Sequence, residues 1–220
     1  MNRTLLQGIR VLEMAGLAPV PHCGMVLADF GAHVTLILKP HDAQDLVLGQ
    51  RMANRKEVRS LDLKEPEDLE VMKQLCQASD VLLDPYRPGV LEKIGLDPVN
   101  LLKIRNSIRP VENRSVIGQP PLLLCSAAGE LVKDHLMRQN KGLVVCRLTG
   151  YGQTGPLANE PGHDINYVSI TGLLPTICGH NSSRPWPPAN LLADFAGGGL
   201  TAAFGIVAAL LKRGKKWSSN

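Results

Sequence analysis

Short apolar runs alternate with helix-like segments along most of the chain, and this alternation constrains the fold more than any other feature. The first forty residues predict a strand over residues 8–14, a helix that opens at Pro19 and Pro21 and stops at Gly31, and a strand over residues 34–38. A short crossover between two such strands is typical of a parallel, right-handed βαβ unit. The N-terminal segment therefore predicts the start of a parallel sheet.

The alternation of predicted strands and helices continues beyond residue 50. Apolar runs predict further strands over residues 59–63, 80–84 and 143–148. Between them, helices are predicted from Pro66 onward, over residues 89–94 and over residues 98–104. The Val-Leu-Leu core of the 80–84 strand is typical of a strand buried on both faces. We therefore expect an α/β fold with an open, doubly wound parallel sheet of the Rossmann-like kind.

Residues 106–141 interrupt this alternation. They contain three prolines, then a Leu-Leu-Leu-Cys run and a polar stretch. A connection of this length without regular elements is uncommon inside a compact domain. We therefore predict an irregular or disordered insertion at 106–141, between residues 1–105 and residues 142–213 of one large domain.

The positive charge of the chain is concentrated near its C-terminal end. The formal net charge is +4, and it is carried by Lys212, Arg213, Lys215 and Lys216. Residues 214–220 are expected to form a basic tail, because cations are favoured near the C-terminus of a helix. Only 4% of the residues are aromatic, which argues against a surface that stacks bases. No nucleic-acid partner is expected.

Cysteine usage indicates a reducing environment. The five cysteines are widely spaced and none belongs to a CxxC pair, which favours buried, reduced thiols over disulfides or a zinc site. The first residues contain no long apolar stretch, so no secretory signal is expected.

Residues 195–211 carry no charged side chain and are close to the minimum length for a membrane span. Three consecutive glycines, 197–199, lie near the start of this segment, and Asp194 precedes it. Glycines permit close approach between helices, in membranes as well as in soluble domains. The composition favours a buried core helix or a dimer helix, and no membrane span is expected.

The sequence Gly-Tyr-Gly-Gln-Thr-Gly at residues 150–155 matches the GxGxxG pattern after a predicted strand. A dinucleotide site also needs a helix that opens at the third glycine and offers its N-terminus to the pyrophosphate. Here Asn159-Glu160-Pro161-Gly162 ends any helix that Pro156 could begin. A tight loop that shapes a pocket is therefore the favoured interpretation.

His163 and Asp194 are the strongest candidates for chemistry. Each lies among glycine and apolar residues, a setting that desolvates a titratable group and moves its pKa toward neutrality. A base and an acid that both work near pH 7 are what proton transfer at carbon requires. Structural alternatives remain open, because His163 could start a helix, and Asp164 or Asp194 could cap one.

Several segments together resemble a known family. They are Gly16-Leu17-Ala18-Pro19, residues 25–32, Leu61-Asp62-Leu63-Lys64, residues 80–83, residues 86–90, residues 150–156, the GHDINY stretch at 162–167, and residues 191–199. With them the chain resembles the α-methylacyl-CoA racemases within the family III CoA-transferase group, over residues 5–105 and 142–213. GHDINY resembles the racemase branch in particular, because transferases of the wider group usually lack that histidine.

The resemblance implies a sheet of the family III CoA-transferase type and an isomerase. These racemases invert carbon 2 of 2-methyl-branched acyl-CoA thioesters by 1,1-proton transfer, with no cofactor beyond the CoA of the substrate. His163 and Asp194 match the two bases on opposite faces of that carbon. Enzymes of this kind act in lipid metabolism, so the resemblance implies an intracellular protein of the peroxisome or mitochondrion.

The resemblance also assigns binding residues for the acyl-CoA substrate. Lys39 stands where the family commonly has an arginine at the nucleotide end of CoA, and Leu61, Asp62, Leu63 and Lys64 match its nucleotide-binding strand and loop. Gly162, Asp164, Ile165, Asn166 and Tyr167 match the segment that touches the thioester. CoA is polyanionic, so Lys39, Lys64 and Arg87 are suitable phosphate partners. Ordinary solvated charges are the alternative for these three.

Two other functions stay open. In a CoA transferase, Asp194 would instead carry an acyl group covalently. Family members also continue past residue 220 with further domains, and their dimers interlock, so the resemblance implies a truncated chain. Such a chain could bind CoA without turnover, and its homodimer is in doubt.

Overall fold

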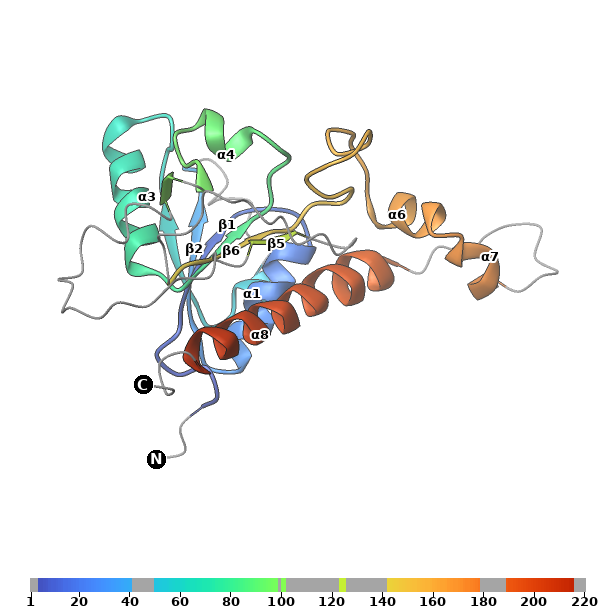
Figure 1. The fold of residues 1–220 in the computed structure, drawn as a ribbon, viewed down its shortest axis with the longest axis horizontal. Helices are drawn as coiled ribbons and strands as arrows, with labels where there is room; N and C mark the ends of the chain where they lie inside the picture. The colour runs from blue at the N-terminus through green and yellow to red at the C-terminus, as the bar shows by residue number, and fades with distance from the viewer. Residues whose placement is uncertain are drawn as a thin grey trace.

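A computed structural model describes residues 4–40, 50–98, 100–101, 123–125, 142–178 and 189–215 (Figure 1). Its centre is a sheet of six parallel strands in the order β3-β2-β1-β4-β6-β5. The strands are β1 (Arg10–Met14), β2 (His33–Leu38), β3 (Lys56–Ser60), β4 (Val81–Asp84), β5 (Leu123–Cys125) and β6 (Val144–Arg147). The predicted open, parallel α/β sheet is confirmed.

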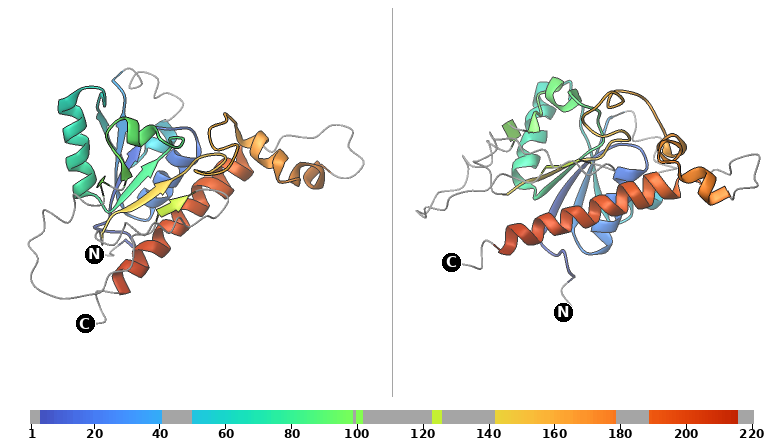
Figure 2. Two further views of the ribbon diagram at one scale, coloured as in Figure 1. Left: turned by 45° about the horizontal axis from the view of Figure 1, so that its top comes forward. Right: turned by 45° about the vertical axis from the view of Figure 1, so that its right-hand side comes forward.

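Helices cover both faces of this sheet (Figure 2). The described helices are α1 (Pro19–Asp29), α2 (Gln50–Ala53), α3 (Pro66–Ala78), α4 (Val90–Lys93), α6 (Asp164–Ile170), α7 (Leu173–Cys178), the π-helix η3 (Leu191–Leu200) and α8 (Thr201–Lys215). Of these, α6 and α7 do not cover the sheet but extend away from it (Figure 1). η3 leads directly into α8, and both pack against α1. Pro19 and Pro66 each open a helix at the position where a missing N–H has no cost, as the sequence predicts.

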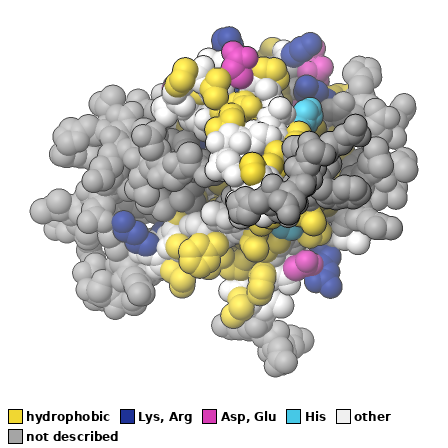
Figure 3. Space-filling model, turned by 90° about the vertical axis from the view of Figure 1, so that its right-hand side faces the viewer, with side chains coloured by type: hydrophobic (Ala, Val, Ile, Leu, Met, Phe, Trp, Pro, Cys, Tyr) yellow, Lys and Arg dark blue, Asp and Glu magenta, His cyan; other side chains and the backbone are white. Residues whose placement is uncertain are grey.

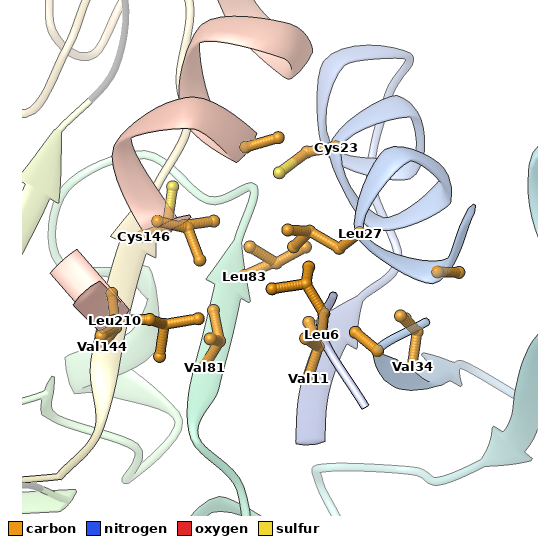
Figure 4. Packing of buried hydrophobic residues seen from close by; sticks show 14 of the residues in the cluster. Leu6, Val11, Cys23, Leu27, Val34, Val81, Leu83, Val144, Cys146 and Leu210 are labelled. Atoms are coloured by element: carbon orange, nitrogen blue, oxygen red, sulfur yellow. The ribbon is translucent and has the colours of Figure 1, made fainter. Parts of the chain in front are cut away.

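Two hydrophobic cores hold the three layers together. On one face, side chains of β1, β2, β4 and β6 meet α1 and α8, and Figure 4 shows Cys23 and Leu27 of α1 beside Leu83 of β4 and Cys146 of β6. On the other face, Met72 and neighbouring residues of α3 meet the alternate strand residues. All four residues of β4 are buried, so its predicted burial on both faces is confirmed.

Two elements differ from the sequence expectation. β3 lies at Lys56–Ser60, three residues before the predicted strand, because it is an edge strand with exposed charged residues and not an apolar run. β5 lies inside the predicted irregular segment 106–141, where the apolar Leu-Leu-Cys stretch pairs in parallel with β6. Apart from β5, that segment lies outside the described residues.

The helix pair η3–α8 buries one side and exposes the other. Gly199 lies so close to α1 that an added Cβ would stand 2.5 Å from His22 Nδ1 and 2.7 Å from Pro19 O. The glycines therefore permit the close packing that the sequence predicts. Leu200, Phe204 and Leu211 are exposed, and hydrophobic side chains are prominent on the adjoining side of the molecule where α6 and α7 lie (Figure 3).

Among the described helices, the stretch Leu191–Arg213 is long and apolar enough to cross a membrane by length and composition alone. The core helix of a soluble protein passes the same test. Here one side of the stretch packs on α1, and Arg213 near its end donates to Asp80 Oδ1 at 3.1 Å. Arg213, one of the four terminal cations, thus anchors α8 to the sheet, and residues 216–220 of the predicted basic tail lie outside the described part.

Three of the cysteines, Cys23, Cys76 and Cys146, are free and buried, as the sequence predicts. Burial raises the pKa of Cys76 to about 12 and that of Cys23 well above its usual range. Such thiols are unreactive near neutral pH. The side chains of Cys125 and Cys178 lie outside the described residues.

Candidate active site

A cavity of about 380 Å³ lies at the carboxyl ends of β1, β4 and β6. In a doubly wound parallel sheet, this edge is where ligands bind. The loops that follow these three strands contribute Gly16, Tyr86 and Gly150 to the lining. His163 and Asp194, which are 31 positions apart in the sequence, line the same cavity. The structure therefore brings together the two residues that the sequence singles out for chemistry.

The loop from β6 to α6 is held by a tyrosine ring. Tyr167 donates from its hydroxyl to Gly162 O and packs edge-on against Tyr151 at a centroid distance of 4.9 Å. A Cβ on Gly150 would stand 2.1 Å from the Tyr167 ring, and one on Gly162 would stand 2.7 Å from it. Both glycines are therefore required for this close approach, and together they fix the backbone immediately before His163.

The GxGxxG segment contains no helix. It is a tight loop in which Thr149 Oγ1 donates to Gly152 O at 2.9 Å, and Gln153 Nε2 donates to Tyr86 O at 3.2 Å. Gly152 and Gly155 have φ values of 79° and 92°, where residues with a side chain are strained. The prediction of a pocket-shaping loop is confirmed, and the segment lacks the helix N-terminus that a dinucleotide site needs.

His163 stands at the N-cap of α6. Its backbone is extended, with φ −127° and ψ 173°, and its N–H donates to Asn166 Oδ1 at 2.9 Å. This contact uses the side chain of Asn166 to satisfy the backbone at the helix start. His163 is exposed and lines the cavity.

Asp194 lies in the first turn of η3 and is half-buried. Burial raises the pKa of its carboxyl, the negative charge of Asp164 raises that pKa further, and His163 opposes the rise. A carboxyl with a raised pKa holds its proton closer to neutral pH and can act as an acid. Asn190 occupies the N-cap of η3, so the alternative in which Asp194 caps that helix is wrong.

Asp164 is the most deeply buried of the predicted site residues, with 1% of its surface exposed. It does not line the cavity. Its Oδ2 accepts hydrogen bonds from the backbone N–H groups of Ala193 and Asp194 at 2.8 and 2.7 Å. The expectation that this side chain touches the substrate is corrected to this extent: the carboxylate is buried, it binds the backbone of η3, and it is outside the lining of the cavity.

The other residues matched to the thioester segment fall into two groups. Gly162 and Tyr167 line the cavity, whereas Ile165 and Asn166 are exposed on α6 and are outside its lining. Asn166 is engaged with the backbone of His163, as described above. Contacts of Ile165 and Asn166 with a substrate stay predictions.

The residues predicted to meet CoA lie along the same edge of the sheet. Lys39 follows β2 and is exposed, and residues 61–64 follow β3, so they lie beyond the carboxyl ends of the two strands that continue the sheet outward from β1. Lys64 is exposed, and its N–H donates to Asp62 Oδ1 at 3.1 Å. Arg87 follows β4, lines the cavity, and donates to Asn159 O at 3.0 Å.

The side chain of Leu61 is a correction among these residues. It is 8% exposed and packs in the core on the α3 face, and Leu63 packs against the same core. The resemblance matches both residues to a nucleotide-binding strand and loop, but in the structure these apolar side chains pack in the core directly after the strand. Nucleotide binding by the loop itself stays a prediction.

Two buried ion pairs were missed from the sequence, one below the cavity loops and one away from the cavity. Arg147 Nε donates to Asp84 Oδ2 at 2.9 Å, at the strand ends below the cavity loops, and burial raises the pKa of Asp84 to about 6. Lys56 Nζ meets Glu13 Oε2 at 2.8 Å with both side chains fully buried. The sequence contained one signal for such a pair. Glu13 is a single charged residue in an otherwise apolar strand, and a buried charge needs a partner.

Within the described part of the chain, no cluster of three or more His, Cys, Asp or Glu side chains could hold a metal ion. The expectation that no cofactor is needed beyond CoA stays a prediction.

Comparison with known proteins agrees with this architecture. The sequence matches the family described as CoA-transferase family III over residues 6–108 and 127–216, so the chain belongs to that family. It is 51% identical to a CaiB/BaiF CoA-transferase family protein of Caenorhabditis elegans over 94% of its own length and 50% of that protein. It is 41% identical to human α-methylacyl-CoA racemase over 94% of its own length and 44% of that enzyme.

Among solved structures, a hypothetical protein of Mycobacterium tuberculosis superposes with a TM-score of 0.72 at 27% identity, over 97% of this chain and 53% of that one. The chain therefore spans about half the length of the relatives it matches. The suspected family membership and the family-type fold are confirmed.

Proposed function

We propose that this chain carries the proton-transfer site of an α-methylacyl-CoA racemase-like isomerase. The observation that carries the proposal is the placement of His163 and Asp194, from the start of α6 and the first turn of η3, in the lining of one cavity. The similarity to human α-methylacyl-CoA racemase supports the same chemistry.

The proposed step moves one proton off and one proton onto carbon 2 of a 2-methylacyl-CoA. One of the two residues removes the α-proton, and the electron pair of the C–H bond moves into an enolate of the thioester. The other residue, protonated beforehand, delivers its proton to the opposite face of the carbon. For the opposite enantiomer the roles exchange, so each turnover conserves the protons of the pair.

The site supplies groups suited to this step. Histidine is the residue type best suited to proton exchange near neutral pH, and Asp194 has a raised pKa that suits a donor. Developing charge on the enolate oxygen needs fixed donors, and the first N–H groups of a helix have no acceptor within the helix. We propose that the backbone at the start of α6, next to His163, provides them.

The test is deuterium incorporation. In heavy water, the chain should exchange the α-proton of each enantiomer of a 2-methylacyl-CoA, which mass spectrometry detects. His163→Ala should slow exchange of one enantiomer by about 10²–10⁴-fold, the usual contribution of a general base, and should affect the other less. His33→Ala, on an exposed histidine at the start of β2, serves as the control. Equal, wild-type exchange of both enantiomers by His163→Ala would show that His163 is structural.

CoA transfer is the second candidate, because the family is described by that reaction. It would require Asp194 to be ionised and to attack the thioester, forming an acyl-aspartyl anhydride and releasing CoA thiolate. Incubation with an acyl-CoA and hydroxylamine would then yield a hydroxamate at Asp194, and Asp194→Asn would abolish it. Deuterium exchange without hydroxamate favours the racemase.

CoA binding is expected at the carboxyl edge of the sheet. Lys39, Lys64 and Arg87 are the proposed phosphate partners, and Lys39→Ala should weaken CoA binding more at low salt than at high salt. Tight CoA binding without α-proton exchange would instead favour a CoA-binding chain without turnover. The homodimer and the compartment, peroxisome or mitochondrion, stay predictions from the family.

A further inference from the structure

The two candidate catalytic groups lie on separate elements, and one side chain connects those elements. Asp164 is the first residue of α6, directly after His163. Its carboxylate leaves its own helix and binds the backbone N–H groups of Ala193 and Asp194 in the first turn of η3. Among the described residues, no other side-chain hydrogen bond joins α6 to η3.

We propose that Asp164 is a positioning residue that fixes the start of η3 against His163 and places a carboxylate charge beside the carboxyl of Asp194. The proposal rests on the proposed function for its catalytic meaning. Two parts of it can be tested in a chain without turnover. They are the pair of hydrogen bonds from η3 to Asp164 and the effect of the Asp164 charge on Asp194.

The clamp acts through the backbone and leaves the Asp194 side chain free. The first N–H groups of a helix point along its axis without acceptors, and a carboxylate there is favoured by the helix dipole. Two charge-assisted bonds of 2.7 and 2.8 Å to one oxygen fix the first turn of η3. The Asp194 side chain takes no part in these two bonds, and Asp194 lines the cavity.

A structural cap alone would not call for a charge at this position. Asn or Ser satisfies helix N–H groups as well as Asp does. Asp164 is nevertheless buried to 1% exposure, and its Oδ1 has no hydrogen-bond partner in the part of the chain that the structure describes. Burying an under-solvated carboxylate is costly, so its charge, and not only its acceptor, is the feature to be explained.

The charged surroundings of Asp194 support an effect from this one residue. Asp164 is the neighbouring negative charge that raises the pKa of Asp194 after burial itself, and His163 opposes it. From α1, His22 faces η3, with its ring centroid 5.0 Å from that of Phe195 in a tilted arrangement, and α8 carries no charged residue before Lys212. The remaining titratable groups of the site are Tyr167 on α6 and, in the loops lining the cavity, Arg87, Tyr151 and Glu160.

The experiment is a carboxyl titration of the full chain labelled with ¹³C at the aspartate carboxyls, with Asp194→Asn to assign the signal. Asp164→Asn keeps an acceptor for the two N–H groups but removes the charge. We expect the titration midpoint of Asp194 to move to lower pH in this variant. Asp68→Asn is the matched control, because Asp68 also accepts a partly buried backbone N–H, from Asp62 at 2.7 Å, but lies on α3. A midpoint of Asp194 that is unchanged in Asp164→Asn would overturn the electrostatic part.

The clamp itself is tested in the wild-type chain, so the proposal does not depend on a variant that folds. The amides of Ala193 and Asp194 should exchange with solvent more slowly than the amide of Leu192. Asp164→Ala should remove that protection, and Asp164→Asn should retain it. Unprotected Ala193 and Asp194 amides in the wild type would overturn the clamp.

These outcomes are separate from those of the proposed function. If the wild type shows no deuterium exchange, racemisation by this chain is rejected, whereas the titration can still be measured. If the chain is active, the acid limb of its pH profile should move to lower pH in Asp164→Asn in step with the Asp194 midpoint. If neither the acid limb of the pH profile nor the titration midpoint of Asp194 moves in Asp164→Asn, the role of Asp164 is rejected, and the proposed racemase function is not affected.

Discussion

Glu13 and Asp164 are both buried carboxylates, and the molecule satisfies them in opposite ways. Glu13, on β1 below α1, meets the Lys56 ammonium at 2.8 Å, and both side chains are fully buried. Asp164, between α6 and η3, meets two backbone N–H groups and no cation among the described residues. When Glu13 is ionised, the first site is neutral as a pair, whereas an ionised Asp164 has no cation to neutralise it among the described residues.

The difference separates a framework site from a functional one. A neutral pair away from the cavity fixes one arrangement of strand and helix without projecting a field. A lone carboxylate beside the cavity changes the proton affinity of whatever lies near it, and here Asp194 lies near it. How a buried charge is satisfied, and not its burial alone, therefore indicates whether it supports the fold or the chemistry.

The largest expected effect comes from breaking the neutral pair. Lys56→Met removes the cation and leaves the buried Glu13 carboxylate unpaired, and Pro21 O also loses the hydrogen bond from Lys56 Nζ at 2.9 Å. We expect the free energy of unfolding at pH 8 to fall by about 3–5 kcal/mol. Urea unfolding followed by circular dichroism measures this loss.

The double variant Glu13→Leu with Lys56→Met is the matched control. Replacing a buried ion pair by apolar residues of similar size is often neutral or stabilising, so it should recover most of the stability. A double variant as unstable as Lys56→Met would mean that the lysine stem, and not the unpaired charge, matters.

The second effect is a pH dependence that belongs to Glu13. Burial raises its pKa from 4.5 to about 7, while Lys56 opposes the rise. The folded state then binds more protons than the unfolded state between pH 4.5 and about 7, so stability is fully present below this window and falls as pH rises through it. The change is at most about 3 kcal/mol. Urea unfolding at pH 5 to 8 should show the decline, and Glu13→Gln should reduce it.

Asp84 also makes the free energy of unfolding fall as pH rises, but by less, because burial raises its pKa only to about 6. Glu13→Gln should therefore flatten the profile without abolishing the slope below pH 6. A profile that is identical in the wild type and in Glu13→Gln would show that Glu13 stays ionised throughout.

The sequence predicts most of the fold because buried strands and proline-opened helices leave local signals. β1, β2, β4 and β6 are apolar runs, and α1 and α3 open at prolines, so their positions follow from residue type. β3 was misplaced because an edge strand needs no apolar run. β5 was missed because its pairing partner, β6, lies twenty residues further along the chain, and only the folded sheet brings them together.

The candidate site was likewise predicted in part. The family motif identifies His163 and Asp194, and the fold then brings them to one cavity. The roles of neighbouring residues depend on where side chains point, which the pattern does not contain. Asp164 was expected to touch the thioester and Leu61 to touch a nucleotide, yet one binds backbone N–H groups and the other enters the core.

The smallest expected effect concerns the contact between α1 and η3, which links the two carboxylate sites. Gly199→Ala would place a Cβ 2.5 Å from His22 Nδ1 and 2.7 Å from Pro19 O, so η3 must shift away from α1. Overpacking of this kind costs about 1–3 kcal/mol. Gly197→Ala is the control, because it makes the same change in the same helix but its added Cβ would meet Leu192 O, at 3.0 Å, and not α1.

If the first turn of η3 is held by Asp164, then α6 and η3 should shift together when Gly199→Ala pushes η3 away from α1. The free energy of unfolding should then fall, but the Ala193 and Asp194 amides should stay protected from exchange. If the first turn of η3 is instead held by α1, those amides should lose protection together with the stability. Hydrogen exchange of these two amides therefore decides whether the position of Asp194 is set from α6 or from α1, and loss of protection in Gly199→Ala but not in Gly197→Ala would count against the role given to Asp164.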